Sequence, residues 1–431
     1  MRAGKPTPFR VGMRASCILV DNNSNIIFKH PQYQNNTLQR TFKFRLYPNL
    51  EQEHKLQNNL SVCRWVYNKF VESAKNGFVS RNDCNYYLTE LKQSESWLYK
   101  YHSKMLQSIS TQIDGAQKAN LEKAKKGYKT GPLKFCRYHD FRTFTYNQSG
   151  FKTENGFLHL SKISRIKIIC HRNIPDDSKI KQVTVTKSKS GKWFACMTVD
   201  ISEPLISIPK ISFSRAVGID MGIKSFAYDS DGCSTPNPLN LKKMLKPLAR
   251  SQRKISRRKK GSNNRLKAIL HMQKIHEKIA NKRNDFHHKL SAQYAKNNIV
   301  FVEDLKIPNM VKNYKLARSI MDSSWGAFLQ KLEYKCKMLV KVPARNTTID
   351  CSRCANRVPK SLAVRIHRCD KCYLVIDRDY NASINILNKG LNIFGQLPQV
   401  TMSVPQELRE LTPVEIKIGQ GSRKPTCFSC G

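Results

Sequence analysis

Four cysteines form the pattern in this chain that is most specific for chemistry. They occur as two CxxC pairs, Cys351 with Cys354 and Cys369 with Cys372, and fourteen residues lie between the pairs. Two such pairs joined by a short loop are typical of a zinc ribbon, in which four thiolates surround the ion tetrahedrally. A closed site of this kind leaves no position for a catalytic water molecule. We therefore expect a structural Zn²⁺ ion, in a ribbon spanning residues 347–372.

Three carboxylates stand at the ends of predicted elements in the second half of the chain. Asp220 follows the apolar run 216–219, Glu303 follows the run 298–302, and Asp379 precedes a predicted helix at 381–387. Carboxylates suit Mg²⁺ or Mn²⁺, and three from separate elements can hold two ions ~3.5–4 Å apart that activate water for attack on a phosphodiester. A single acid at such a position is as readily a turn residue or a helix cap. The three together, beside a basic stretch, indicate a nuclease.

The third acid of this set has two candidates. Asp377 and Asp379 are separated only by Arg378, and both precede the predicted helix. Asp379 could be the helix N-cap, and Asp377 could lie behind the metal ligand and support it. Residue type and spacing do not decide between them.

A basic stretch separates the first two acids. No Asp or Glu occurs from Cys233 to His276, and the chain carries 76 Lys and Arg against 31 Asp and Glu, a net charge of +45. Such an excess needs a polyanion to offset its self-repulsion, so we expect a nucleic-acid partner. The densest part of the stretch is predicted to bind phosphates through Arg250, Arg253, Lys254, Arg257, Arg258, Lys259 and Lys260.

The other ten cysteines show no comparable pattern. Eight occur singly, and Cys427 and Cys430 form a CxxC with no second pair nearby, which we expect in an unstructured tail rather than at a metal. The basic N-terminus is not followed by an apolar leader, and no run of eighteen apolar residues occurs. We therefore expect a soluble intracellular protein, with no membrane partner and with metal-binding rather than disulfide-bonded cysteine pairs.

Hydrophobic periodicity indicates a multidomain α+β protein. Alternating apolar residues predict a strand at 41–46 and several strands between 132 and 202, which would form a small β-barrel with helices inserted between them. After a linker at 204–209, apolar strands alternate with helices, the longest at 264–290. Residues 1–40 show no strong period, and we interpret them as a weakly structured extension.

These motifs, taken in order, resemble the TnpB family of RNA-guided nucleases from bacterial and archaeal insertion sequences. Beyond the four cysteines and the three acids, the resemblance covers about residues 41–395 and rests on segments 42–48, 144–151, 191–193, 218–222, 251–257, 261–265, 302–305 and 377–382. In that family the aspartate two residues before Asn-Ala is catalytic. Since Asn381 and Ala382 occupy that place here, the resemblance selects Asp379 over Asp377.

The resemblance also implies a fold and its domains. It implies a RuvC-like nuclease domain of RNase H fold with an inserted zinc ribbon, and a wedge-type β-barrel with an inserted helical recognition lobe. The expected divisions are an N-terminal extension (1–40), the wedge-like barrel (41–49 and 131–205), the recognition lobe (50–130), the nuclease (211–346 and 373–395), the ribbon (347–372) and a C-terminal tail (396–431).

The function implied is cleavage of guide-matched DNA beside a short sequence motif, by two-metal-ion hydrolysis. The partners would be a guide RNA from the transposon end and the target DNA, and we expect a monomer. The resemblance also implies that the protein acts in the prokaryotic cytoplasm or nucleoid. Two alternatives stay open, a non-cleaving transposition regulator that kept the fold and a compact type V CRISPR effector. The sequence departs from the family where a glycine often follows each CxxC, because Ala355 and Tyr373 stand there, and this puts the ribbon turns in doubt.

Overall fold

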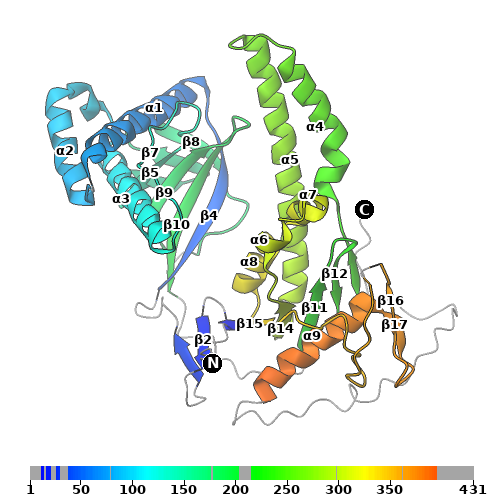
Figure 1. The fold of residues 1–431 in the computed structure, drawn as a ribbon. Coiled ribbons are helices and arrows are strands. Elements are labelled where there is room, and N and C mark those ends of the chain that lie inside the picture. The colour runs from blue at the N-terminus through cyan, green and yellow to red at the C-terminus, as the bar shows by residue number, and fades with distance from the viewer. Residues whose placement is uncertain are drawn as a thin grey trace. The chain divides into compact units, whose positions relative to one another are not determined.

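The computed structural model divides the chain into two compact units (Figure 1). The smaller unit comprises residues 32–206, and the larger unit comprises residues 1–31 and 207–431. The predicted linker 204–209 and the tail with Cys427 and Cys430 lie outside the described residues, which are 11–13, 16–20, 26–29, 37–77, 79–175, 178–202, 215–297, 299–361 and 363–395. None of the described helices is both long enough and apolar enough to cross a membrane.

The smaller unit is built on a seven-stranded antiparallel sheet. The strand order is β5-β9-β10-β4-β8-β7-β6, and the described pairs do not join the outer strands β5 and β6 into a closed barrel. The first strand begins at Thr37, earlier than the prediction at 41, and pairs with β10 along its whole length. The strands are β4 (Thr37–Tyr47), β5 (Thr143–Asn147), β6 (Phe151–Glu154), β7 (Phe157–Leu160), β8 (Ser164–Ile169), β9 (Lys179–Lys187) and β10 (Trp193–Ser202).

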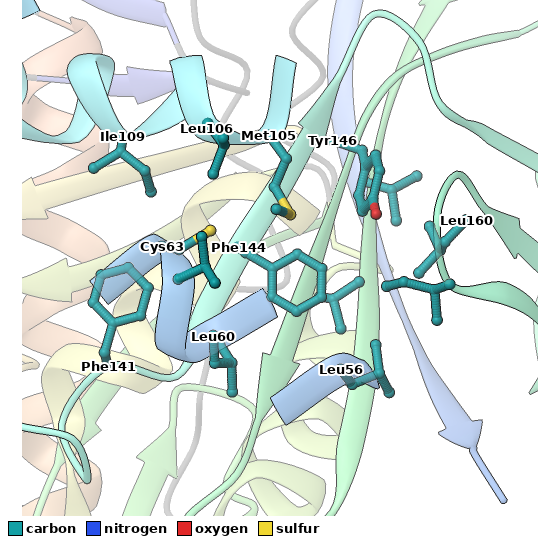
Figure 2. Close-up of a cluster of buried hydrophobic side chains, with 14 of the residues drawn as sticks. Leu56, Leu60, Cys63, Met105, Leu106, Ile109, Phe141, Phe144, Tyr146 and Leu160 are labelled. Carbon is teal, nitrogen blue, oxygen red and sulfur yellow. The ribbon is translucent and has the colours of Figure 1, made fainter. Parts of the chain in front are cut away.

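Three helices lie between β4 and β5 in the chain, and the first and third of them pack against this sheet, while the second packs against the third. They are α1 (Leu50–Ser73), α2 (Arg81–Ser94) and α3 (Ser103–Lys125). Helix α1 begins with a capping box, in which Asn49 and Gln52 each accept a hydrogen bond from the other's backbone N–H. The sheet and helices share one hydrophobic core, and Figure 2 shows Leu56, Leu60, Cys63, Met105, Leu106, Ile109, Phe141, Phe144, Tyr146 and Leu160 of it.

The larger unit contains a mixed eight-stranded sheet of order β13-β12-β11-β14-β15-β1-β2-β3. Strands β11, β14 and β15 are parallel, and β12 and β13 continue antiparallel on one side. All five residues of β14 are buried, as expected for a central strand that is covered on both faces. These strands are β11 (Ala216–Met221), β12 (Ser225–Asp229), β13 (Ser234–Pro236), β14 (Ile299–Glu303) and β15 (Met338–Val342).

The N-terminal residues extend this sheet, so the prediction that 1–40 is only a weakly structured extension is wrong for three segments. Strand β1 (Val11–Met13) pairs antiparallel with β15, and β2 (Ser16–Val20) and β3 (Ile26–Lys29) follow it. The edge of β15 offers unpaired backbone groups that an added strand can satisfy. Two short apolar runs of this region, 17–20 and 26–28, are long enough to form strands, although neither shows a clear period.

Helices cover both faces of the sheet in the larger unit. Helices α5 (Asn263–Tyr294) and α8 (Trp325–Lys335) contribute to a core with Phe226 and Val302, while α9 (Arg378–Gly395) packs with Phe301 and Val340. Helix α4 (Asn240–Ser256) pairs with α5, and α6 (Ile307–Met310) and α7 (Tyr314–Ser323) follow β14. A two-stranded sheet, β16 (Ile366–Arg368) and β17 (Val375–Asp377), leads into α9.

Candidate metal sites

The four predicted zinc ligands come together in the larger unit. The Sγ atoms of Cys351, Cys354, Cys369 and Cys372 all lie within 4.8 Å of one another. Two of the separations, Cys351 to Cys372 and Cys354 to Cys369, are 3.5 Å. Four sulfurs placed tetrahedrally ~2.3 Å from a zinc ion are ~3.8 Å apart. The donor atoms therefore have both the chemistry and the spacing of a four-thiolate zinc site.

Each cysteine pair is followed by a residue with left-handed backbone. Ala355 has φ 58° and Tyr373 has φ 57°. Their N–H groups donate to the carbonyl oxygens of the first cysteine in each pair, at 2.9 and 2.8 Å. Glycine adopts this conformation freely, whereas a residue with a Cβ is disfavoured by ~1–2 kcal/mol. The absence of glycine at these positions thus strains both turns but does not alter their form.

Two asparagines of α9 connect the cysteine loop to this helix. The side-chain oxygen of Asn381 accepts from the N–H of Ser352 at 2.9 Å, and its Nδ2 donates to the carbonyl oxygen of Asp350 at 2.8 Å. Asn385 Nδ2 donates to the carbonyl oxygens of Asp350 and Thr347 at 2.7 and 2.8 Å. Both asparagines are buried, so these hydrogen bonds are costly to break. They fix the segment around the first cysteine pair to the first two turns of α9.

Helix α9 approaches the sheet closely at two glycines. A Cβ on Gly218 of β11 would lie 2.3 Å from a backbone carbonyl oxygen of α9, and one on Gly390 of α9 would lie 2.0 Å from the Phe301 ring of β14. Alternate residues of a strand share a face. Asp220 and Glu303 therefore lie on the face that α9 covers, two residues after Gly218 and Phe301.

The predicted acids Asp220 and Glu303 are neighbours on parallel strands. Ile219 of β11 pairs with Val302 of β14, and each acid is the next residue of its strand. Burial, followed by the charges of Glu303 and Asp379, raises the pKa of Asp220 well above its ordinary value. Burial also raises the pKa of Glu303. The structure thus brings all three predicted acids near one another, where their charges repel.

Such a set of hard, mutually repelling oxygen donors suits a divalent cation such as Mg²⁺ or Mn²⁺. It is less tightly gathered than the sulfur atoms, because among the described residues only the cysteine cluster has all its ligand atoms within 4.8 Å of one another. Asp379 is partly neutralised by arginine, since Arg378 donates to its Oδ1 from Nε at 3.1 Å and from Nη2 at 3.0 Å.

The structure assigns the helix cap to Asp377 rather than to Asp379. Asp377 Oδ1 accepts from the backbone N–H groups of Asp379 at 2.7 Å and Tyr380 at 3.3 Å. One of its two carboxylate oxygens is therefore held at the N-terminus of α9. The Asp379 side chain is 16% exposed and interacts with Arg378 and, at 3.4 Å, with Arg365. Burial is the first cause of the raised pKa of Asp220, and of the two candidates the charge of Asp379 adds more to it than the charge of Asp377.

Sequence reasoning missed the roles of two residues, Thr347 beside Glu303 and Asn381 between the cysteine loop and α9. The hydroxyl of Thr347 donates to Glu303 Oε1, and Thr347 carries no motif that would have revealed it. Asn381 was noticed only as part of a family motif. A physical signal for it was present, because Asn381 and Asn385 lie four residues apart on the apolar face of α9 beside the buried Ala382 and Ile386. Polar residues on such a face need partners.

The predicted phosphate-binding residues lie on the hairpin formed by α4 and α5. Six of the seven are exposed, and Arg258 is half-buried because its guanidinium donates to the carbonyl oxygen of Asn264 at 2.7 Å and holds the turn. Helix α4 was not predicted from the sequence, where the charges of this stretch were interpreted only as a phosphate-binding surface. Its N-terminus is capped from α7 by Asp322, which accepts from Leu241 N at 2.9 Å and pairs with Arg283 at 3.0 Å. This buried carboxylate anchors the base of the hairpin.

Three family models match parts of the chain. One described as a probable transposase matches residues 198–314, and one described as a Cas12f1-like TNB domain matches 325–386, which includes the cysteine cluster. A third, described as a helix-turn-helix domain, matches 36–78. In the structure the last segment is strand β4 followed by the single long helix α1 and a short 3₁₀ turn.

Curated relatives match most of the chain. A putative RNA-guided DNA endonuclease of Streptomyces pristinaespiralis is 34% identical over 372 residues, covering 82% of this chain and 90% of the relative. The putative RNA-guided DNA endonuclease InsQ of Escherichia coli K12 is 28% identical over 405 residues, covering 86% and 98%. TnpB-like protein L79 of Acanthamoeba polyphaga mimivirus is 23% identical over 395 residues, covering 81% and 73%.

A solved structure supports the same fold. The Cas12f1 chain of a complex with sgRNA and target DNA superposes with a TM-score of 0.52 and 14% identity, covering 83% of this chain and 100% of that one. An identity this low bears on the fold alone, and it agrees with a mixed α+β architecture. The relationship to the Streptomyces protein is much closer and extends over nine-tenths of that protein. The chain belongs to the TnpB family.

Proposed function

We propose that this protein is an RNA-guided DNA endonuclease of an insertion sequence, which hydrolyses phosphodiester bonds of guide-matched DNA. The observation that carries the proposal is the convergence of Asp220, Glu303 and Asp379 from β11, β14 and α9. Family membership supports guided DNA cleavage, and the acids supply the groups that such cleavage requires. The order β13-β12-β11-β14-β15, with its antiparallel hairpin followed by parallel strands, supports a RuvC-like domain of RNase H fold.

The proposed catalytic groups divide into ligands and residues that position them. Asp220, Glu303 and Asp379 would hold two Mg²⁺ or Mn²⁺ ions, which when bound activate water and stabilise the attacking and leaving oxygens. The Thr347 hydroxyl holds one oxygen of Glu303, and the other oxygen would act as a ligand. Asp377 caps α9 and so sets the direction in which the helix presents Asp379.

The cysteine cluster has a structural role in this proposal. Zn²⁺ held by Cys351, Cys354, Cys369 and Cys372 would close the loop that precedes α9. The hydrogen bonds of Asn381 then join this loop to the helix turn that contains Asp379 and restrict the movement of that turn. The zinc ion would affect cutting only by positioning the Asp379 carboxylate. It would not activate water itself, because the four sulfurs leave no coordination position for a water molecule.

Nucleic-acid contacts are assigned to basic surfaces outside the acid site. The exposed arginines and lysines of the α4–α5 hairpin would bind the phosphate backbone of the guide RNA and its target DNA. The seven-stranded sheet and the helices α1–α3 would serve as the wedge and the recognition lobe. We propose that a monomer carries out these functions, with a guide transcribed from the transposon end.

Purification with the bound RNA tests this function directly. The RNA that copurifies should be one defined species, and its complex with Mg²⁺ should cut DNA that matches the guide beside one flanking motif. A library of matched targets with randomised flanks would identify the motif. Random RNA fragments would contradict guided cleavage. Tight guide binding without cutting at any flank would instead favour the non-cleaving regulator.

A further inference from the structure

We propose that Tyr228 and Tyr380, here called the tyrosine pair, form a stacking subsite for an unpaired nucleobase beside the reacting phosphate. The proposal rests on the proposed function of the acid site and adds a substrate contact to it. It assigns these side chains to binding and positioning of the substrate, whereas the chemistry stays with the acids.

The tyrosine pair adjoins the acids from two different elements. The rings of Tyr228 on β12 and Tyr380 on α9 are stacked, with centroids 5.6 Å apart and an interplanar angle of 29°. Tyr228 is the cross-strand partner of Asp220, so the two side chains leave the same face of the sheet, with Cα atoms ~5 Å apart. Tyr380 directly follows Asp379. A base stacked here would therefore belong to a nucleotide at or next to the reacting phosphate.

Small residues border the pair, and one of them is Gly232, on which a Cβ would lie 3.8 Å from the Tyr380 ring. On the side of β12 away from Asp220, the cross-strand partner of Tyr228 is Ser234, a small and exposed residue of the edge strand β13. Both tyrosines are half-buried, and neither belongs to the hydrophobic core, to which β12 contributes Phe226 and Ala227. Among the described residues, neither phenol has a hydrogen-bond partner. Core packing therefore does not account for the pair.

The surrounding charge selects a nucleobase rather than a phosphate. The carboxylates of Asp377 and Asp231 lie close enough to act electrostatically on Tyr228 and Tyr380, respectively. This acidic environment repels a phosphate group but not the uncharged face of a base, which stacks on aromatic rings in any sequence. A base within a duplex already has stacking partners on both sides. The subsite therefore fits a single-stranded segment of the DNA.

Paired substitutions of the protein and the DNA test this subsite. Guide complexes of wild type, Tyr228→Phe and Tyr228→Leu would cut matched DNA that carries one abasic residue at successive positions around the cut. Since stacking contributes ~1–3 kcal/mol per base, Tyr228→Leu should lower kcat/KM about tenfold and Tyr228→Phe less than about twofold. One abasic position should lower cutting by the wild type to the same extent. That position should have no effect in Tyr228→Leu.

The combined result separates stacking from a purely structural role. If Tyr228→Leu stays as sensitive as the wild type to every abasic position, the subsite does not exist. A second readout is independent of cutting: 2-aminopurine placed at successive positions should be quenched at one of them in the Glu303→Gln complex, and the quenching should be lost when Tyr228→Leu is added. If the wild type does not cut, the proposed function fails. If no position is quenched, the stacking proposal fails whether or not the DNA is cut.

Discussion

The cysteine cluster and the proposed acid site are built in opposite ways, although α9 connects them. All four sulfurs come from one segment of 22 residues, 351–372, and two similar turns hold them. The acids come from positions 220, 303 and 379, and only the packing of α9 on the sheet brings them together. The first site is closed and local, whereas the second must stay open to water and substrate. The cysteine cluster, which forms within one short segment, thus supports the acid site, which depends on packing between distant segments.

The largest effect should come from the acid site. Glu303→Gln removes a proposed metal ligand, and we expect cutting to fall by at least ~100-fold, because bound metal ions contribute several kcal/mol of charge stabilisation. Folding should be unimpaired, since the substitution also removes a repelling charge beside Asp220. The measurement is single-turnover cleavage with Mg²⁺, together with a melting curve.

Asp304→Asn is the matched control for this substitution. Asp304 is the next residue, but it is exposed and pairs only loosely with Lys306 at 3.7 Å. It should cut at the wild-type rate. Equal losses in Glu303→Gln and Asp304→Asn would show that general charge at this edge, and not a ligand, is responsible.

Cutting should also depend on the cysteine cluster, through α9. Cys369→Ser should reduce bound zinc and lower cutting about tenfold or more, because ligand loss destabilises a zinc loop and Asn381 no longer has a fixed partner segment. Zinc content by mass spectrometry and single-turnover cleavage measure the two effects. Cys170→Ser, at an exposed lone cysteine, should change neither. A zinc-free variant that cuts normally would contradict the prediction that the acid site depends on the cysteine cluster.

Packing of α9 should affect the acid site while sparing the cysteines. In Gly390→Ala the new Cβ would lie 2.0 Å from the Phe301 ring, and we expect a loss of ~1–3 kcal/mol in unfolding free energy and slower cutting. Gly115→Ala is the control, because Gly115 lies within helix α3 with nothing near its Cβ. That substitution should stabilise by ~0.5–1 kcal/mol. Zinc binding should survive in both variants, and its loss in Gly390→Ala would contradict the independence of the cysteine cluster.

The same contrast explains what the sequence could predict. The cysteines were identifiable because their spacing within one loop is itself the site, and the structure brings together all four. Asp220 and Glu303 were suggested by acids at the ends of apolar runs, and their closeness follows from parallel neighbouring strands. Choosing Asp379 over Asp377 needed the family resemblance. The capping role of Asp377 is visible only in the folded helix, where its carboxylate accepts hydrogen bonds from backbone N–H groups.

Other features could not be predicted, because distant segments determine them. Strands β1–β3 form on the free edge of β15, which lies more than 300 residues later in the sequence. Helix α4 contains Pro247 and a dense run of charges, and its cap comes from Asp322 of α7. The short-range pattern of β1–β3 is weak, and for these strands and for α4 a partner far along the chain stabilises the observed form.

The smallest expected effect concerns the strained turns of the cysteine loop. Tyr373 is exposed at φ 57°, so Tyr373→Gly should relieve ~1–2 kcal/mol of strain and lose ~0.4–1 kcal/mol to a more flexible unfolded chain. The net gain should be about 1 kcal/mol or less, seen as slower zinc release to a chelator with unchanged cutting. Tyr373→Ala removes the same ring but keeps a Cβ in the left-handed conformation, so it should give no gain. Equal stabilisation by glycine and alanine would mean that the ring, and not the backbone, opposes the turn.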